Sequence, residues 1–381
     1  MGRIVTDADA INLLRSLVSI PSPSGEERAA AEWLVDWMNA HGFAAAVDAV
    51  GNAVGHRGTG ARRILLLGHI DTFPGQLPVH CDDDTLTGRG TVDAKGALCA
   101  FVAAVAAVEV SDDWQISVVG AVEEEAASSR GARHLLTEWT PPEVCIIGEP
   151  SGWDRITLGY KGRLMADLHW RAPFSHSAGR GALPAEQAVA VWNAVVEHCD
   201  TQNAHRSGDD HDSGGESPGA FDRLDPSLRH IATRDDGAWC EVEMTIGLRL
   251  PPHLAPASVA GAIQRTVERC GLNLTVGWGE NCAAGDRIVF YAPEVAYRSD
   301  KNTTLVRACL AGIRASGGRP RFVLKTGTSD MNVVGPVWNV PIVAYGPGDS
   351  ALDHTPDEHI SLAEYLRSIA VLRHALAALQ Q

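Results

Sequence analysis

The chain has 381 residues, a formal net charge of −15 at pH 7, 45% hydrophobic residues and 21% charged residues. This composition predicts a globular protein that is long enough for two domains with separate cores. The acidic balance argues against nucleic acid as a partner, because phosphate binding depends on clustered lysine and arginine.

The eight cysteines include no pair at C-x-x-C spacing. They are typical of reduced thiols rather than of a disulfide framework or a thiolate zinc site. The N-terminus lacks a signal-peptide core, and no apolar run approaches membrane-spanning length. We therefore expect a cytoplasmic protein that does not contact a membrane.

Residues 7–42 carry two amphipathic helix patterns, separated by a Pro- and Ser-rich segment at 20–25. Ser24 and Glu27 have the spacing of a capping box, which predicts that the second helix begins there.

The first candidate site residues end an apolar run at 63–71, which has the length of a buried strand. His69 and Asp71 lie two positions apart, so in a strand their side chains share a face. A carboxylate placed in this way can orient a metal-binding imidazole. The alternative is a strand end with two solvated polar residues.

The second candidate is Asp93, which glycines bracket just before a helix-like run at 97–110. A carboxylate in a tight turn can bridge two cations, because each oxygen can serve a different metal ion. The alternative is that Asp93 caps the helix.

Two further apolar strands, at 116–122 and 144–148, run directly into Glu123-Glu124-Glu125 and into Glu149. His354 follows a Gly- and Pro-rich loop at 345–350. Adjacent glutamates repel one another unless cations or protons neutralise them, although a solvated acidic turn is the usual alternative. Since open α/β sheets place their sites at the carboxyl ends of strands, we expect these residues to converge at one sheet edge.

Strands and helices alternate up to about residue 160, which predicts a mainly parallel sheet flanked by helices. The pattern then changes, with strands at 163–171, 228–250 and 272–279 and helices at 184–199 and 255–270. After residue 287 the first domain resumes, with helices at 303–316 and 361–379. This predicts an α/β domain of residues 1–160 and 287–381, and an inserted α+β domain of residues 161–286.

The inserted segment contains a polar, Gly- and Ser-rich stretch at 205–219 with two histidines and four acidic residues. A flexible solvated loop is favoured over a metal site, because nothing rigid would hold the ligands there.

Taken together, the motifs around His69, Asp93, Glu124, Glu149 and His354 resemble those of the di-zinc M20 metallopeptidases and amidohydrolases, over essentially the whole chain. The resemblance implies two zinc ions, for which Co²⁺ can substitute, bound by His69, Asp93 and Glu149 and by Asp93, Glu125 and His354. Asp93 would be the bridge, Asp71 would orient the first ligand, and Glu124 would be the general base. Glu123 and Glu124 remain an alternative to Glu124 and Glu125 as the pair of base and ligand.

The same resemblance implies that the inserted domain is a lid and dimerisation domain with four strands and two helices. The segment 174–178 resembles a lid motif whose histidine reaches into the site of the neighbouring subunit. His176 is therefore the candidate donor to the oxyanion, and activity would require a homodimer. Without the resemblance, His176 would be a surface histidine.

Three segments, at 159–163, 325–332 and 344–350, resemble the hydrolases that act on lysine or ornithine attached to an amino-group carrier protein. This implies cleavage of the amide between the γ-carboxyl of the carrier's C-terminal glutamate and the α-amino group of lysine or ornithine, a step of lysine or arginine biosynthesis. The alternative is an N-acetyl-ornithine or N-acetyl-lysine deacetylase, or a related small-substrate carboxypeptidase of the M20 family.

Recognition of the product's α-carboxylate would need fixed hydrogen-bond donors. A loop of hydroxyl-bearing residues around a glycine offers such donors and consists of Thr326, Gly327, Thr328 and Ser329, with Asn332 nearby. Arg249 resembles an arginine of the family's lid that lies near the substrate carboxylate. The alternative for Arg249 is a surface charge at the end of a strand.

Overall fold

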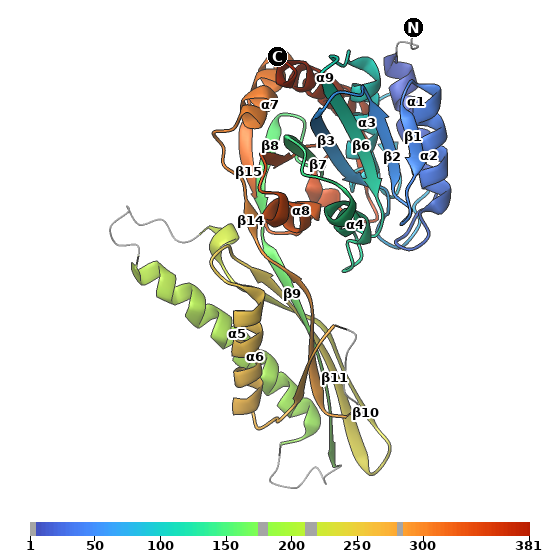
Figure 1. The fold of residues 1–381 in the computed structure, drawn as a ribbon. Coiled ribbons are helices and arrows are strands. Elements are labelled where there is room, and N and C mark those ends of the chain that lie inside the picture. Colours follow the sequence, from blue (N-terminus) through green and yellow to red (C-terminus); the bar gives the residue numbers. More distant parts are fainter. Residues whose placement is uncertain (1–4, 174–181, 210–218, 280–284) are drawn as a thin grey trace. The chain divides into compact units, whose positions relative to one another are not determined.

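The computed structural model describes residues 5–173, 182–209, 219–279 and 285–381 of the chain. The chain divides into two compact units (Figure 1). The first consists of Met1–Gly159, Arg298–Leu324 and Ser329–Gln381, and the second of Tyr160–Tyr297 and Lys325–Thr328. Each unit has its own cluster of buried hydrophobic residues. The expected pair of separate cores is therefore present.

The first unit is built on a mixed sheet that has nine strands among the described residues. Its order is β1 (Ala44–Val47), β2 (Ala53–Arg57), β6 (Trp114–Ala121), β3 (Arg62–His69), β7 (Val144–Gly148), β16 (Ile342–Ala344), β8 (Arg155–Tyr160) and β14 (Tyr297–Arg298), and β15 (Arg321–Lys325) pairs with β8. The central strands β6, β3, β7 and β16 are parallel. Antiparallel pairs flank them. The prediction of a mixed sheet flanked by helices is confirmed, but its parallel pairs are confined to these central strands, so the sheet is less parallel than expected.

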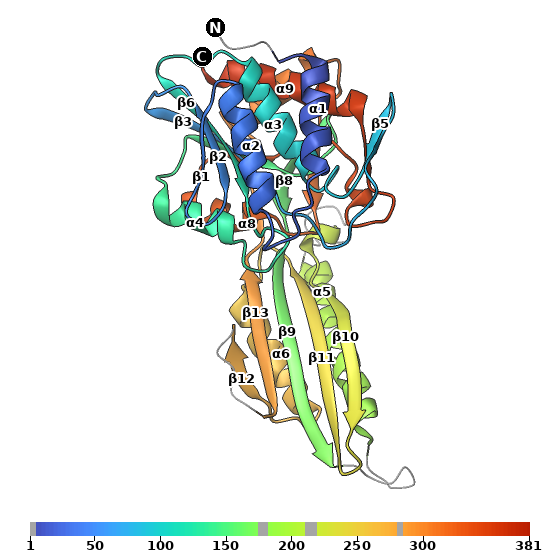
Figure 2. The ribbon, with the colours of Figure 1, turned by 90° about the vertical axis from the view of Figure 1, so that its right-hand side faces the viewer.

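Helices cover both faces of this sheet. Successive side chains of a strand point to opposite faces, and the central strands are apolar at nearly every position, so both faces must be covered. Leu66, Val118 and Ile146 lie in the main core with α1 (Asp7–Val18), α2 (Arg28–Ala40), α3 (Lys95–Ala107), α7 (Thr304–Ala315) and α9 (Leu362–Leu379). Figure 2 shows α1, α2 and α3 in front of the strands. Two shorter helices, α4 (Arg130–Glu138) and α8 (Asp330–Trp338), pack on each other and contact β6 and β16.

A row of glycines lies across the centre of the sheet, where Gly68 is in register with Gly120 on β6 and Gly148 on β7. A Cβ atom on Gly120 would lie 3.0 Å from Leu98, and one on Gly148 would lie 2.8 Å from Phe101. Both of those residues belong to α3. The missing side chains therefore allow α3 to pack closely on the sheet, next to the strand ends that carry the candidate site.

In its described residues, the second unit consists of a mostly antiparallel sheet covered by two α-helices. The strand order is β10 (Asp225–Asp235), β11 (Trp239–Leu250), β9 (Gly162–Pro173), β13 (Arg287–Glu294) and β12 (Thr275–Trp278). Strand β11 buries alternate residues, among them Val242, Met244 and Ile246. These pack with residues of α5 (Pro184–Asp209) and α6 (Pro256–Arg269) in the second core.

The second unit differs from the sequence-based expectation in two ways. Its sheet has five strands in the described part of the chain, where four were expected. The additional strand, β13, begins at Arg287, where the expected domain boundary placed the return to the first unit. Ile288 and Phe290 of β13 are buried in the second core, and the strand pairs with β9. The sequence does not reveal this because pairing partners 120 or so residues apart leave no local signal.

Two local predictions were also wrong. Helix α2 begins at Arg28 with Glu27 at its N-cap and no side-chain cap, so Ser24 and Glu27 do not form a capping box. The polar segment 205–219 was expected to be a loop, but α5 continues to Asp209, and residues 210–218 lie outside the described part. A small sheet of β4 (His80–Cys81), β5 (Thr85–Thr87) and β17 (His359–Ser361) was not anticipated.

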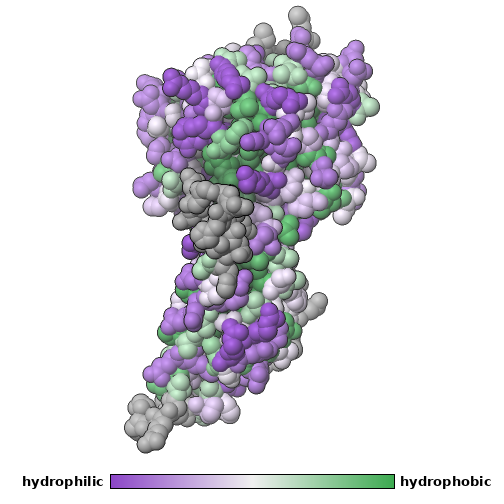
Figure 3. All heavy atoms as spheres, turned by 90° about the vertical axis from the view of Figure 1, so that its left-hand side faces the viewer, coloured by the Kyte–Doolittle hydropathy of each residue, from purple (hydrophilic) through white to green (hydrophobic). Residues whose placement is uncertain are grey.

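Hydrophilic residues spread over the face of the first unit that Figure 3 shows, with smaller hydrophobic areas between them. Among the described residues, no helix combines the length and the apolar character needed to cross a bilayer.

Candidate metal centre

The candidate ligands come together at one edge of the first unit's sheet. His69 ends β3, Glu124 and Glu125 follow β6, and Glu149 follows β7. Asp93 lies just before α3, and His354 follows the turn η2 (Ser350–Leu352). Parallel neighbouring strands place their carboxyl ends side by side, which is why residues distant in sequence meet here.

Asp93 lies between the two histidines. Its Oδ1 is 3.2 Å from Nε2 of His69, and its Oδ2 is 3.0 Å from Nε2 of His354. The same His354 nitrogen is 3.0 Å from Oε1 of Glu125. Each oxygen of Asp93 thus faces a different imidazole, which is the arrangement that a carboxylate bridging two cations requires.

Two groups of side chains could each hold a metal ion, because within each group the nitrogen and oxygen atoms lie within 4.8 Å of one another. One group is Asp93, Glu125 and His354, and the other is His69, Glu124 and Glu149. Imidazole nitrogen and carboxylate oxygen suit a divalent transition metal such as zinc, whose ligands lie about 2 Å from the ion. The residues present therefore fit divalent cations at two neighbouring positions, and Asp93 belongs to one group while its Oδ1 faces His69 of the other.

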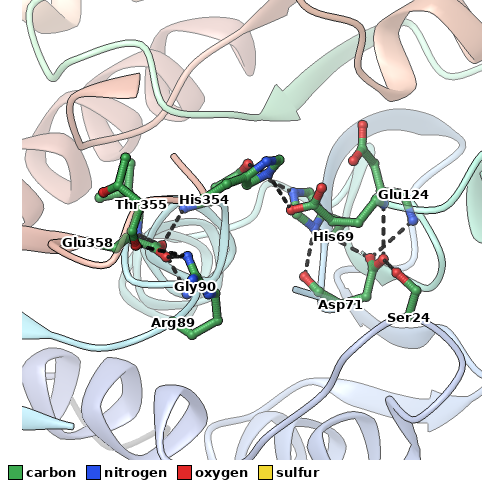
Figure 4. A network of polar contacts seen from close by, with 12 residues as sticks. Ser24, His69, Asp71, Arg89, Gly90, Glu124, His354, Thr355 and Glu358 are labelled. Carbon is green, nitrogen blue, oxygen red and sulfur yellow. Dashed lines mark hydrogen bonds and ion pairs between the residues drawn. The ribbon is translucent and has the colours of Figure 1, made fainter. Parts of the chain in front are cut away.

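Asp71 lies beneath these groups and is completely buried. Its carboxylate accepts hydrogen bonds from the Ser24 hydroxyl at 2.7 Å and from the backbone N–H groups of Glu124 and Glu125 at 3.1 and 3.0 Å (Figure 4). It also lies 3.4 Å from Nδ1 of His69. Asp71 therefore fixes the turn that carries both glutamates and contacts the first histidine.

Glu123 is turned away from the two groups. It adopts φ 58°, in the left-handed region that non-glycine residues rarely occupy. Its carboxylate pairs with Arg130 at 2.7 Å and accepts the Ser128 hydroxyl at 2.6 Å. Because Glu123 is engaged with the start of α4, the geometry favours Glu124 and Glu125 as the acidic pair of the site.

Burial and negative charge disfavour ionisation of the glutamates. Burial raises the pKa of Glu124 well above its usual range, and the charges of Asp330, Glu125 and Asp93 raise it further. Burial, together with Glu124 and Asp93, likewise raises the pKa of Glu149. Divalent cations would relieve this repulsion and allow the carboxylates to ionise.

The histidines respond in the opposite sense. Hydrogen bonds with Asp93 and Glu125 raise the pKa of His354 to about 10. Burial lowers the pKa of His69, but hydrogen bonds with Asp71 and Asp93 outweigh it and raise that pKa well above the usual value. For Asp93 itself, burial opposes ionisation, whereas the two histidines hold its pKa below the usual value. Positive charge is thus favoured at the positions where cations would bind.

The expected substrate-binding residues are divided between the two units. Ser329 caps α8, where its hydroxyl accepts the N–H of Met331 at 3.2 Å, and Asn332 Oδ1 accepts the N–H of Ser329 at 2.9 Å. Arg249 donates to the Thr328 hydroxyl at 3.1 Å within the second unit, which also includes Thr326 and Gly327. His176 lies outside the described residues.

Sequence reasoning missed three residues that support the site. Ser24 holds Asp71, and Glu27 accepts the backbone N–H of Glu123 at 3.1 Å. Glu358 is a fully buried acid that accepts hydrogen bonds from the Asp93 turn. Ser24 and Glu27 were assigned to a local cap because their spacing fitted one. For Glu358, the only sequence signal was its place four residues after His354.

A protein-family model described as Peptidase family M20/M25/M40 matches residues 65–378, which span the whole candidate centre. The chain belongs to this family. As an M20 member it is a metal-dependent amidohydrolase, and it has the α/β architecture expected from the sequence.

Similar proteins match nearly the whole chain. It is 47% identical over 377 residues to the "[LysW]-lysine hydrolase" of Deinococcus radiodurans, with 98% of each chain covered. It is 38% identical over 369 residues to a "Putative [LysW]-lysine/[LysW]-ornithine hydrolase" of Thermococcus kodakarensis, covering 97% of this chain and 92% of that one. The M20 family metallo-carboxypeptidase Sso-CP2 of Sulfolobus solfataricus shares the fold, with a TM-score of 0.77, 16% identity, and 98% and 99% coverage.

Proposed function

We propose that this chain releases lysine, or ornithine, from an amino-group carrier protein by hydrolysing the amide to the γ-carboxyl of the carrier's C-terminal glutamate. The observation that carries the proposal is Asp93, whose two oxygens face His69 and His354 between two groups of candidate metal ligands. Relatives that match 98% and 97% of the chain are named as hydrolases of [LysW]-lysine and of [LysW]-lysine and [LysW]-ornithine, which supports the proposal. The reaction would supply an amino acid in lysine or arginine biosynthesis.

In this proposal His69, Asp93 and Glu149 hold one zinc ion, and Asp93, Glu125 and His354 hold the other, with Co²⁺ as a substitute. When bound, the two ions would polarise the scissile carbonyl and lower the pKa of the attacking water. For the second ion, support comes from Asp93, Glu125 and His354, whose donor atoms lie within 4.8 Å of one another. For the first ion, His69 and Glu149 belong to the other group, and Asp93 Oδ1 lies 3.2 Å from His69 Nε2.

Glu124 would take the proton from the attacking water and return it to the leaving amine, so that the amino acid departs with a free α-amino group. Two observations support this role. Glu124 lies among the candidate ligands, and Asp71 holds its backbone N–H. Glu123, the alternative base, is paired with Arg130.

Recognition of the substrate carboxylate is assigned to Arg249 and to the backbone and hydroxyl donors of Thr326, Gly327 and Thr328. The hydrogen bond from Arg249 to Thr328 supports the pairing of these two elements. Ser329 and Asn332 would contribute chiefly by fixing the first turn of α8, since their side chains cap that helix.

The function is tested by offering the purified zinc-loaded chain four substrates separately: carrier-linked lysine, carrier-linked ornithine, Nα-acetyl-lysine and Nα-acetyl-ornithine. Mass spectrometry of the carrier and assay of free amino acid would measure release. We expect cleavage of at least one carrier-linked substrate with kcat/KM above that for both acetylated compounds. Cleavage of the acetylated compounds alone would establish the deacetylase alternative.

We also propose a cytoplasmic homodimer in which His176 of each subunit donates a hydrogen bond to the oxyanion in the partner's site. Seven cysteines of the described residues are free thiols, which suits a reducing compartment. Mixed dimers of His176→Ala and Glu124→Gln would contain one site with both functional groups. We expect co-expression to restore part of the activity that each variant lacks alone, and no restoration would place His176 in its own subunit's site or outside catalysis.

A further inference from the structure

Glu358 gathers several donors around one buried carboxylate. Its Oε1 accepts the backbone N–H groups of Gly90, Val92 and Asp93 at 2.9, 3.0 and 3.2 Å. Its Oε2 accepts Nη1 of Arg89 at 2.7 Å, and the residue is buried (Figure 4). Four donors from the turn before α3 therefore converge on a residue more than 260 positions later in the chain.

The same contacts join the two segments that carry candidate metal ligands. Glu358 is four residues beyond His354, and its carbonyl oxygen accepts the N–H of Gly88 at 3.2 Å. Arg89 also donates to the carbonyl oxygen of Thr355 at 3.3 Å. The turn that ends at Asp93 is thus hydrogen-bonded to the segment that follows His354, through both the side chain and the backbone of Glu358.

Arg89 also contacts the loop after β3, and this loop contacts His354. Arg89 donates to the carbonyl oxygen of Gly75 at 3.1 Å, and its guanidinium lies 5.8 Å from the ring centre of Phe73. Phe73 in turn stacks on the imidazole of His354 at 4.3 Å. Two independent routes therefore connect Arg89 and Glu358 with the position of the His354 ring.

We propose that Glu358 is a positioning residue that holds Asp93 and His354 at the separation needed for two cations before either ion binds. The inference rests on the proposed metal-dependent function, and it adds a residue that does not touch substrate or metal. Groups that orient metal ligands in this way raise affinity, because the site does not have to be ordered when the ion arrives.

The hydrogen bonds that Glu358 accepts require a carboxylate at this position. An ionised glutamate has acceptor oxygens only, and here both face N–H donors. In Glu358→Gln the amide nitrogen must face either the three backbone N–H groups or the guanidinium of Arg89. Either orientation places donor against donor and leaves a buried polar group without an acceptor.

Calorimetric titration of the metal-free protein with zinc tests the proposal. We expect Glu358→Gln to bind zinc about 10 to 100-fold more weakly than the wild type, as for other residues that orient ligands. Glu364→Gln is the matched control, because Glu364 Oε1 also accepts two backbone N–H groups, from Trp153 at 3.0 Å and Gly348 at 3.1 Å. The amide oxygen of Glu364→Gln can still accept both N–H groups, so the control is expected to keep its zinc affinity.

A double variant distinguishes a positioning role of Glu358 from a general loss of folding stability. With Arg89→Met added to Glu358→Gln, the amide oxygen can face the backbone donors and the amide nitrogen can face the carbonyl of Thr355. We therefore expect the double variant to regain part of the zinc affinity lost in Glu358→Gln, a non-additive result. Additive weakening of zinc binding by the two substitutions would overturn the proposal.

The outcomes also separate this inference from the proposed function. A wild-type chain that binds no zinc or cobalt would overturn both. A wild-type chain that binds two ions, together with a Glu358→Gln variant of equal affinity, would overturn only the role of Glu358. If Glu358→Gln does not fold, Arg89→Met carries the test, since it leaves the three backbone hydrogen bonds in place and is expected to weaken zinc binding to a smaller extent.

Discussion

At the scale of single residues, the candidate metal centre contains carboxylates that have different roles although they lie close together. Asp71 is buried and accepts backbone N–H groups, so it orients the turn after β6. Asp93 contacts two imidazoles, and Glu123 pairs with an arginine. Hydrogen-bond partners, rather than residue type, therefore distinguish an orienting acid from a candidate ligand or a structural ion pair.

Substitution of the adjacent glutamates tests this distinction. Glu124→Gln removes the group that we assign as the general base, and kcat is expected to fall by roughly 10²–10⁴-fold while the metal content stays full. Glu123→Gln is the control and is expected to keep near-normal turnover, because that side chain contacts Arg130 and Ser128. Steady-state kinetics with metal analysis would measure both variants. Full metal content with near-normal turnover in Glu124→Gln would move the base to Glu123.

Some residues could not be assigned from local spacing. Ser24 and Glu27 fit a capping box, but the structure directs them to Asp71 and to the backbone of Glu123. Glu358 gave no periodic signal, because its partners lie on a turn more than 260 positions earlier. Contacts between segments that are far apart in sequence decide the role of such residues, and spacing along the chain does not record those contacts.

At the scale of elements, the approach of α3 to the sheet positions the centre. The absence of side chains at Gly68, Gly120 and Gly148 lets α3 pack closely on the sheet, and Asp93 lies just before the start of this helix. The buried strands were predictable, since their apolar runs are nearly continuous. Helix α8 was not predicted, because Gly335 and Pro336 interrupt its short pattern.

A glycine substitution tests the close packing of α3. The Cβ atom of Gly148→Ala would lie 2.8 Å from Phe101 and 2.9 Å from the Cα of Gly68, so the helix or strand must shift. We expect a loss of about 1–3 kcal/mol in the free energy of unfolding. Gly261→Ala in α6 meets only the flexible end of Arg265 at 3.4 Å and is expected to gain roughly 0.5–1 kcal/mol. Calorimetric unfolding would compare them, and equal stability of the two variants would contradict the packing argument.

At the scale of the whole molecule, acidic groups concentrate where the sheet ends meet. Burial, followed by repulsion between neighbouring acids, raises the pKa of Glu124 and Glu149, and burial raises that of Glu125. The folded chain without metal therefore binds more protons than the unfolded chain above the usual carboxyl range. Its stability accordingly falls as the pH rises through that window.

This linkage predicts opposite effects of pH on the metal-free and zinc-loaded protein. The metal-free chain is expected to be less stable in urea at about pH 8 than at about pH 6. Zinc requires deprotonated ligands, so its stabilisation should be larger at the higher pH. In Glu149→Gln the pH dependence of the metal-free protein should become weaker. A metal-free wild type that is more stable at the higher pH would contradict the assignment.

The sequence by itself determined the α/β sheet, the insertion of a second unit, and the residues that end the buried strands, because apolar periodicity and strand-end chemistry are local properties. Tertiary structure alone decided that β13 joins the second sheet, that Glu123 turns away from Glu124 and Glu125, and that Glu358 holds the Asp93 turn. Each of these depends on a partner distant in sequence, and only the folded chain brings such partners together.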